Sequence, residues 1–184
     1  MSLSKWIQVA IVVSLSASAQ APAQPPSHPP SQPCLSDMPD TLRAALEQDN
    51  WKIVQREDLS VSDLRAWKDR HPGDCPGVAS GNFSPRVKQS FIVALIQRDT
   101  QNNLTEKVLL AAMKKNKPES EFAITTMSIA TPYVVWKLPK GHYLGIEGTK
   151  ASISRNSFVY EKLIGPASQY YYDGSHLKSF VISR

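Results

Sequence analysis

Short β-rich segments separated by proline or glycine fill most of the chain after residue 90. β-Branched and aromatic residues favour strands, whereas proline and glycine interrupt them. We expect strands at residues 51–54, 91–96, 123–130, 133–138, 142–147, 157–164, 169–172 and 175–182. Because two helical segments precede most of these strands, the sequence predicts an α+β fold, in which short N-terminal helices pack against a mainly antiparallel β-sheet.

Two short stretches near the start of the predicted domain are typical of helices. Residues 38–47 have Pro39 near the first helical position and acidic residues at the start. Ser60 or Ser62 is placed to cap a second helix, which continues through residue 68. We expect one side of this helix to carry Val61, Leu64 and Trp67. A His-Pro-Gly sequence then ends it.

Residues 107–113 fit two kinds of secondary structure. Their Leu, Ala, Met and Lys content suits a helix that begins at Thr105. Their position after the strand at residues 91–96 and a polar connection suits the return arm of a hairpin. We favour the strand.

The last hairpin has the clearest local signal. Residues 169–172 and 175–182 flank Asp173-Gly174, a pair that tolerates the positive φ angles of a type I′ turn. A two-residue loop here predicts that Tyr171 lies opposite His176. Since three successive tyrosines alternate across a sheet, at least one ring points outward, and we predict that Tyr171 and His176 form an exposed pair that binds a partner. An ordinary cross-strand pair is the alternative.

The first residues have the features of a secretory signal. Lys5 is followed by a short apolar stretch and then by two overlapping Ala-x-Ala sites. Cleavage after Ala19 is favoured over cleavage after Ala21, because Pro22 follows the second site. We therefore expect a signal peptide at residues 1–19 and a secreted or periplasmic protein. A retained membrane anchor is the alternative, although the apolar stretch is too short to span a bilayer comfortably.

A proline-rich segment follows the signal. Six of the twelve residues from Pro22 to Pro33 are proline, which favours an extended, solvated chain without a packed core. We expect a disordered tether at residues 20–33 and a single globular domain at residues 34–184. A ligand for an SH3-like domain is the alternative use of such a segment. We expect no transmembrane span after signal cleavage, because no apolar run reaches roughly 18 residues.

The chain has two cysteines, Cys34 and Cys75. In an oxidising compartment the simplest expectation is that they form a disulfide bond. Closing a loop of about 42 residues stabilises a fold by roughly 4 kcal/mol in the chain-entropy model. The alternative is that Cys75 is a nucleophile with His71 as its base.

Residues 71–83, with the sequence His-Pro-Gly-Asp-Cys-Pro-Gly-Val-Ala-Ser-Gly-Asn-Phe, resemble a segment of uncharacterised exported bacterial proteins. Residues 160–162 and the aromatic Asp-Gly hairpin resemble the C-terminal end of the same group. The resemblance implies export and no established activity. Gly81-Asn82-Phe83 is also similar to the start of integrin-type propeller repeats, whose following acidic loop binds calcium. Residues 84–88 hold two cations and no carboxylate, so this second resemblance implies no calcium site.

Local sequence gives no sign of a catalytic or metal site. The histidines are His28, His71, His142 and His176, and no two of them have a zinc-binding spacing. The chain also lacks the Gly-x-Ser-x-Gly and Ser-x-x-Lys motifs and a phosphate-binding glycine loop. We therefore expect no metal, no cofactor and no enzyme activity. An envelope hydrolase with dispersed catalytic acids or histidines is the alternative.

Positive charge is concentrated in one segment. The chain has 21 Lys and Arg against 16 Asp and Glu, and residues 85–117 alone hold seven cations and two acids. Such a segment attracts an acidic protein or an anionic envelope polymer, and we predict Lys114, Lys115 and Lys117 as contacts. Solubility or protection of a sheet edge is the alternative. Nucleic acid is not an expected partner, because export and the lack of a known motif disfavour it.

Together these features predict an exported, non-catalytic domain that binds another macromolecule. An inhibitor, an immunity-like factor and an envelope accessory protein all fit this description. A structural envelope protein is a further alternative. The sequence does not predict an oligomeric state.

Overall fold

Strand β3 (Ser90–Arg98) lies at the centre of the larger sheet and packs apolar side chains on both faces. One face carries Phe91, Val93 and Leu95, and the other carries Ile92, Ala94 and Ile96. Burial on both faces explains why residues 91–96 form an unbroken apolar run. The computed structural model describes residues 35–184, apart from the side chains of Phe122 and Thr125.

β3 belongs to an antiparallel sheet that we call sheet A. Its members are β1 (Lys52–Ile53), β2 (Val78–Gly81), β3, β4 (Leu104–Lys114) and β5 (Lys117–Ile129). β1 and β2 follow one another along the same edge of β3, and β4 pairs with the opposite edge. β5 pairs with the outer side of β4.

A second antiparallel sheet, sheet B, has the strand order β11-β10-β9-β6. Its members are β6 (Val134–Leu138), β9 (Ser157–Glu161), β10 (Ala167–Asp173) and β11 (His176–Ser183). A separate two-stranded hairpin consists of β7 (Gly141–Leu144) and β8 (Lys150–Ile153).

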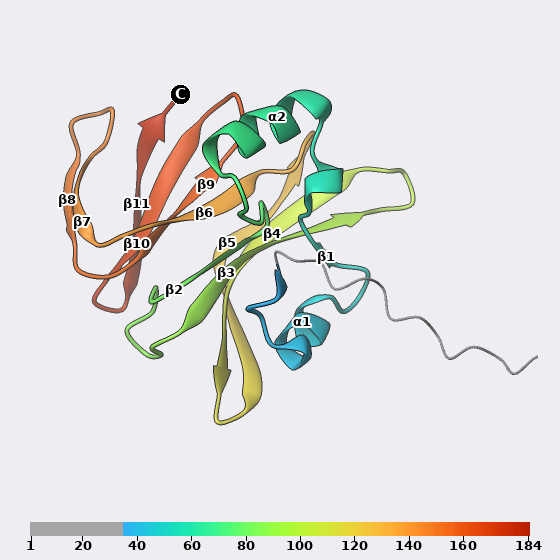
Figure 1. Cartoon of the computed structure of the whole chain (residues 1–184), viewed down its shortest axis with the longest axis horizontal. Coiled ribbons are helices and arrows are strands. Elements are labelled where there is room, and N and C mark those ends of the chain that lie inside the picture. Colours follow the sequence, from blue (N-terminus) through green and yellow to red (C-terminus); the bar gives the residue numbers. More distant parts are fainter. Residues whose placement is uncertain (1–34) are drawn as a thin grey trace, which may run out of the picture. The chain divides into compact units, whose positions relative to one another are not determined.

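Three apolar clusters hold these elements together in successive layers (Figure 1). Helix α1 (Asp40–Leu46) packs on one face of sheet A through Leu42 and Leu46. The opposite face of sheet A packs against sheet B, and helix α2 (Val61–Arg70) adds the fully buried Trp67 to that cluster. The β7–β8 hairpin packs on the other face of sheet B.

Both predicted helices are present, and their N-termini have the expected chemistry. Pro39 is the N-cap of α1. Ser60 caps α2, where its hydroxyl oxygen accepts a hydrogen bond from the Asp63 N–H at 3.2 Å. A 3₁₀ turn, η2 (Arg56–Asp58), precedes α2. Of the three residues expected on one side of α2, Trp67 is fully buried, whereas Val61, at the first helical position, is 90% exposed.

The expected α+β fold is correct in its antiparallel sheets and wrong in its balance. The described residues form eleven strands and only two short α-helices, so the domain is closer to mainly β. The physical reason is that sheets A and B bury each other's apolar faces. The two helices cover the apolar surface of the sheets that this contact leaves exposed. The prediction of a strand at residues 107–113 is confirmed, since they lie within β4.

The C-terminal hairpin is present, but its two-residue loop lies one residue later than predicted, so each residue of the first strand pairs two positions further along the second. Asp173 pairs with His176, and the two-residue loop is Gly174-Ser175. Gly174 has a φ of +60° whereas Ser175 keeps a negative φ, which is the pattern of a type II′ turn with glycine first. Tyr171 therefore lies opposite Lys178 and not opposite His176.

Candidate functional site

Residues 71–83, which resemble exported bacterial proteins, connect α2 to β2 and are held by backbone hydrogen bonds. The Asp74 carbonyl accepts a hydrogen bond from Trp67 Nε1 at 3.2 Å. The Pro76 carbonyl accepts one from the Val135 N–H at 2.8 Å, which links this segment to β6 of sheet B. The segment thus joins α2, sheet A and sheet B.

Gly77 is a tightly packed position of this segment. A Cβ atom at residue 77 would lie 2.3 Å from the carbonyl oxygen of Val54. The Gly77 carbonyl itself accepts a hydrogen bond from the Ala94 N–H at 2.9 Å. Only glycine fits, because two backbone segments pass each other too closely for a side chain.

His71 lies between two tryptophan rings. Its ring stacks on Trp67 with 4.4 Å between centroids and tilts against Trp136 at 4.8 Å. Burial lowers the pKa of His71, and the nearby Glu161 carboxylate opposes this shift. Cys75, the alternative nucleophile, is only 5% exposed and packs in the cluster on the α1 side of sheet A. Its predicted disulfide partner, Cys34, lies outside the described residues, so that pairing stays a prediction.

Glu161 is the buried anion of this region, with 4% of its surface exposed. One of its oxygens accepts a hydrogen bond from Arg70 Nη1 at 2.5 Å, and the other accepts one from Trp136 Nε1 at 2.9 Å. Both oxygens are engaged, so the carboxylate anchors α2 to sheet B and is poorly placed to act as a base. Sequence reasoning missed this ion pair because 91 positions separate its members.

Glu106 is a second buried carboxyl group that sequence reasoning missed. It is 0% exposed and lies on the face of β4 that also carries Leu104 and Val108. Its Oε2 accepts a hydrogen bond from the Tyr133 N–H at 3.0 Å, whereas Oε1 has no hydrogen-bond partner among the described residues. Desolvation raises the pKa of Glu106 to about 8. Its place between two apolar residues of the same strand face was the available signal.

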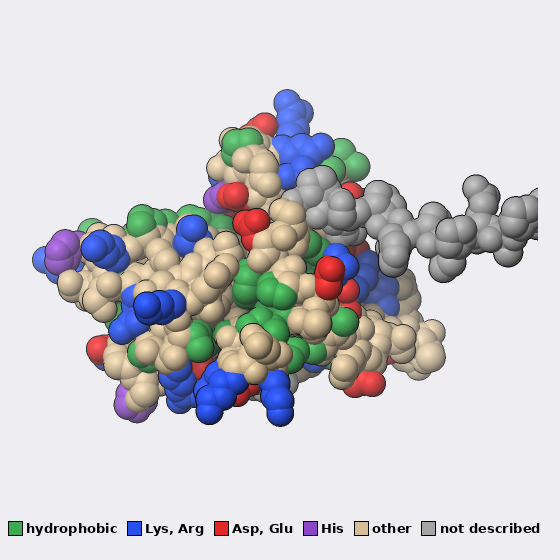
Figure 2. All heavy atoms as spheres, turned by 60° about the horizontal axis from the view of Figure 1, so that its bottom comes forward, with side chains coloured by type: hydrophobic (Ala, Val, Ile, Leu, Met, Phe, Trp, Pro, Cys, Tyr) green, Lys and Arg blue, Asp and Glu red, His purple; other side chains and the backbone are tan. Residues whose placement is uncertain are grey.

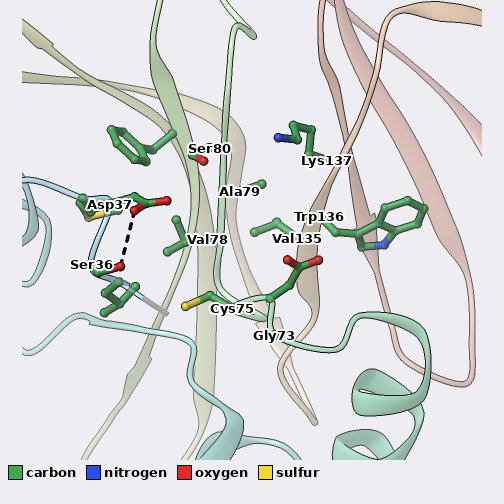
Figure 3. A pocket seen from close by; sticks show the side chains of 14 residues that line it. Ser36, Asp37, Gly73, Cys75, Val78, Ala79, Ser80, Val135, Trp136 and Lys137 are labelled. Carbon is green, nitrogen blue, oxygen red and sulfur yellow. Dashed lines mark hydrogen bonds between the residues drawn. The ribbon is translucent and has the colours of Figure 1, made fainter. Parts of the chain in front are cut away.

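A cavity of about 260 Å³, which we call the β2–β6 hollow, opens between these two strands. Its lining comes from residues 35–38, 73–75, 78–80 and 135–137, with Phe91. Asp37 and Lys137 lie on opposite sides of it (Figure 3). Asp74 adds a second carboxylate to the rim. Charges of both signs therefore surround two strand edges, an arrangement suited to binding.

The predicted basic contacts gather at the tip of the β4–β5 hairpin. Lys114 pairs with Lys117, and the turn between them is Lys115-Asn116, with φ angles of +49° and +61°. Positive φ at both positions is the pattern of a type I′ turn, here formed without glycine. Two cations of the loop before β3 line cavities shared with Lys114. We call the whole group the basic end; it comprises Arg86, Lys88, Lys114, Lys115 and Lys117.

A second cavity, of about 460 Å³, lies at the basic end. Its lining includes three lysines, three apolar side chains and one acid: Lys88, Lys114, Lys115, Val87, Phe91, Met113 and Asp37. Two of the cations of the basic end are paired, Lys114 with Glu119 at 3.2 Å and Arg86 with Glu121 at 3.1 Å. The face shown in Figure 2 carries several Lys and Arg side chains around a hydrophobic patch.

The predicted pair of Tyr171 and His176 is not formed. The Tyr171 ring is half-buried and packs edge-on against Phe180, with 6.0 Å between centroids, in the cluster beneath the β7–β8 hairpin. His176 is exposed beside the hairpin turn, opposite Asp173. The shift in register separates the two residues that were expected to act together.

Other site classes have no structural support in the described part of the chain. Among residues 35–184, no group of three or more His, Cys, Asp and Glu side chains is arranged to hold a metal ion. No described helix is long and apolar enough to cross a membrane. Comparisons with protein-family models, with curated proteins and with solved structures gave no match.

Proposed function

We propose that this protein is an exported, non-catalytic binding domain that engages an acidic partner protein through the basic end. The observation that carries the proposal is the cavity at that end, where Lys88, Lys114 and Lys115 surround one hollow. Three cations at a single concave surface favour an anionic partner and speed its approach.

Much of this positive charge has no partner of its own. Within residues 35–184, no carboxylate lies within 4.0 Å of the ammonium groups of Lys88, Lys115 or Lys117. Lys114 has only the exposed Glu119, a contact of the kind that contributes little to stability. The basic end therefore keeps charges available for a ligand.

The apolar part of the cavity favours a protein over a purely polar polymer. Val87, Phe91 and Met113 line the same surface as the lysines. Methionine adapts its shape to many apolar partners and is common at binding surfaces. An acidic protein can supply both carboxylates and an apolar side chain, whereas an anionic polymer supplies only the charge.

Charge reversal tests the proposal. The native protein is used to capture partners from secreted and envelope fractions, and the affinity for the retained protein is then measured at two salt concentrations. We expect Lys88, Lys115 and Lys117, all changed to Glu, to reduce this affinity at least tenfold and to flatten its salt dependence. The matched control changes the exposed Lys140, Lys150 and Lys162 to Glu and should leave binding within twofold.

Two results would overturn the proposal. If both triple variants lost the same affinity for the partner, net charge and not the basic end would control binding. Retention of an anionic polysaccharide or lipid in place of a protein would show that the partner belongs to another class.

A further inference from the structure

Exposed aliphatic side chains occupy two turns of the C-terminal half. Ile146 lies in the turn between β7 and β8 and is 48% exposed, and Ile164 lies in the turn between β9 and β10 and is 71% exposed. Leu144, the last residue of β7, is 65% exposed. These three account for most of the large apolar side chains that are exposed among residues 35–184.

The end of β11 holds the two turns next to each other. The Ile146 N–H donates to the Val181 carbonyl at 3.0 Å, and the Ser183 hydroxyl donates to the Gly165 carbonyl at 3.3 Å. Val181 and Ser183 are two positions apart on one strand, so their Cα atoms are separated by about 7 Å. Figure 1 shows both turns beside the C-terminal end of β11, at the top of the view. The three exposed side chains therefore share one end of the molecule, which we call the apolar end.

Ile164 has a backbone conformation that isoleucine rarely adopts. Its φ is +59°, in the left-handed region where a branched Cβ crowds the backbone. Glycine or asparagine forms such a turn with less strain. Because most of the Ile164 side chain is exposed, packing within the fold does not compensate for this strain. The side chain therefore indicates a contact with something outside the chain.

Two lysines without an acidic partner accompany the apolar end. Lys150 pairs with Leu144 across the β7–β8 hairpin. A Cβ atom at residue 165 would lie 3.2 Å from Cδ of Lys162, so the stem of this lysine crosses the turn that carries Ile164. Among residues 35–184, neither ammonium group has a carboxylate within 4.0 Å.

We propose that the apolar end docks on an anionic lipid surface, with its aliphatic side chains among the headgroups and the two lysines against the lipid phosphates. Aliphatic side chains enter the boundary between headgroups and acyl chains, and lysines nearby are attracted to anionic lipids. Glu147, the acid of the β7–β8 turn, is already paired with Arg184 at 2.6 Å, so it opposes this attraction little.

The shape of the apolar end favours lipid over a protein partner. Its side chains project from separate turns, and a fluid surface accepts such side chains without a matching shape. A protein would need a closely fitting surface for each of them. The apolar end is separate from the basic end, and the proposal does not depend on the function proposed above.

Binding to lipid vesicles tests the proposal. The vesicles contain either phosphatidylcholine alone or phosphatidylcholine and phosphatidylglycerol in equal amounts. Each protein is purified in the form that its native source contains, and its affinity is measured by cosedimentation at two salt concentrations. We expect the native protein to bind the anionic vesicles at least tenfold more tightly than the neutral ones, and to bind them more weakly at the higher salt concentration.

Ile164→Asn separates lipid binding from folding. Asparagine tolerates a positive φ, so this variant should keep the native Tm or raise it, yet bind anionic vesicles at least fivefold more weakly. The matched control, Val61→Ser, removes a side chain that is 90% exposed at the start of α2. Its position is at the opposite end of α2 from Arg70, which contacts sheet B. We expect this control to leave vesicle binding within twofold.

Charge reversal tests the two lysines. Lys150→Glu combined with Lys162→Glu should reduce the preference for anionic vesicles to less than threefold. The control with the same change of charge is Lys140→Glu combined with Lys178→Glu, which lie before β7 and near the start of β11, away from both turns. It should keep the preference within twofold of native. Since Lys150 and Lys162 belong to the control set for the basic end, binding of an acidic protein and of vesicles are tested as separate properties.

Three results would overturn the proposal. The first is equal binding of the native protein to neutral and anionic vesicles, or no saturable binding to either. The second is an equal effect of Ile164→Asn and Val61→Ser on vesicle binding. The third is unchanged vesicle binding by Ile164→Asn together with reduced capture of a protein from envelope fractions, which would assign the apolar end to a protein partner.

Discussion

The backbone N–H of Tyr133 donates a 3.0 Å hydrogen bond to Glu106 Oε2 inside the cluster between sheets A and B. The Tyr160 hydroxyl, which donates to Met127 Sδ at 3.6 Å, also favours the ionised form of this carboxyl group. These contacts lower the pKa of Glu106, but desolvation outweighs them and raises it from 4.5 to about 8. A carboxyl group that is neutral at pH 7 is therefore part of the core.

This group makes stability depend on pH. Between pH 4.5 and about 8 the folded protein holds a proton that the unfolded chain has released. The free energy of unfolding should therefore fall as pH rises through this range, with a slope that approaches about 1.4 kcal/mol per pH unit. Urea denaturation at intervals of half a pH unit measures the slope.

Glu106→Gln should remove that slope. Its amide stays neutral, so the variant should match the native protein near pH 5 and exceed it in stability by about 4 kcal/mol above pH 8. Glu119→Gln changes an exposed carboxylate and should leave the slope intact. A native slope that persists in Glu106→Gln would assign the pH dependence to another group.

The Arg70–Glu161 pair should contribute measurably to stability. Arg70→Met leaves the buried Glu161 carboxylate with Trp136 as its remaining hydrogen-bond donor, so we expect a loss of about 1–3 kcal/mol in the free energy of unfolding. Arg65→Met changes an exposed residue of the same helix and should cost less than about 0.5 kcal/mol. If Arg70→Met and Arg65→Met unfolded at the same urea concentration, the Arg70–Glu161 pair would not anchor α2 to sheet B.

Gly77→Ala should be severely destabilising, by about 3 kcal/mol or more, because the new Cβ meets the Val54 carbonyl oxygen at 2.3 Å. The control is Gly141→Ala, where the nearest atom lies at 3.4 Å, on the Tyr143 ring. We expect a lowered yield or a Tm drop of several degrees only for residue 77. A Tm within one degree of the native value in both variants would contradict the close approach.

Export and the predicted disulfide bond are tested together by thiol labelling. Denatured, unreduced protein from its native source should show no reactive thiol, and reduction should expose two, from Cys34 and Cys75. Reduction should also lower stability by up to about 4 kcal/mol. Two labelled thiols without reduction, or a cytosolic location on fractionation, would contradict export.

Features encoded within a few residues could be predicted from the sequence. A helix cap at Ser60 or Ser62 and the apolar run of β3 follow from local composition and spacing, and the strand at residues 107–113 follows from its position after another strand. The structure has the cap at Ser60 and both strands. The C-terminal turn shows the limit of local reasoning. Asp-Gly permits a turn at Asp173, but the strand register places the glycine first in the loop, and every cross-strand pair changes with it.

The candidate sites were only partly predictable, because they depend on contacts between distant segments. The count of charges along the sequence identified the lysines around the β4–β5 turn. The sequence did not indicate that Lys88 would line the same cavity as Lys114 and Lys115, because only the fold brings them together. The β2–β6 hollow depends on the approach of strands more than fifty positions apart. Sequence alone contains no signal for which edges of two sheets meet and remain unpaired.

The alternation of β3 side chains between two clusters has a consequence for how the molecule comes apart. Disruption of either cluster would expose the apolar side chains on one face of β3 to water. Separation of α1 or of sheet B from an intact β3 therefore requires a large free energy. We therefore expect the amides of β3 to exchange with deuterium only during global unfolding. Proteases that cut surface loops should release no stable half-domain.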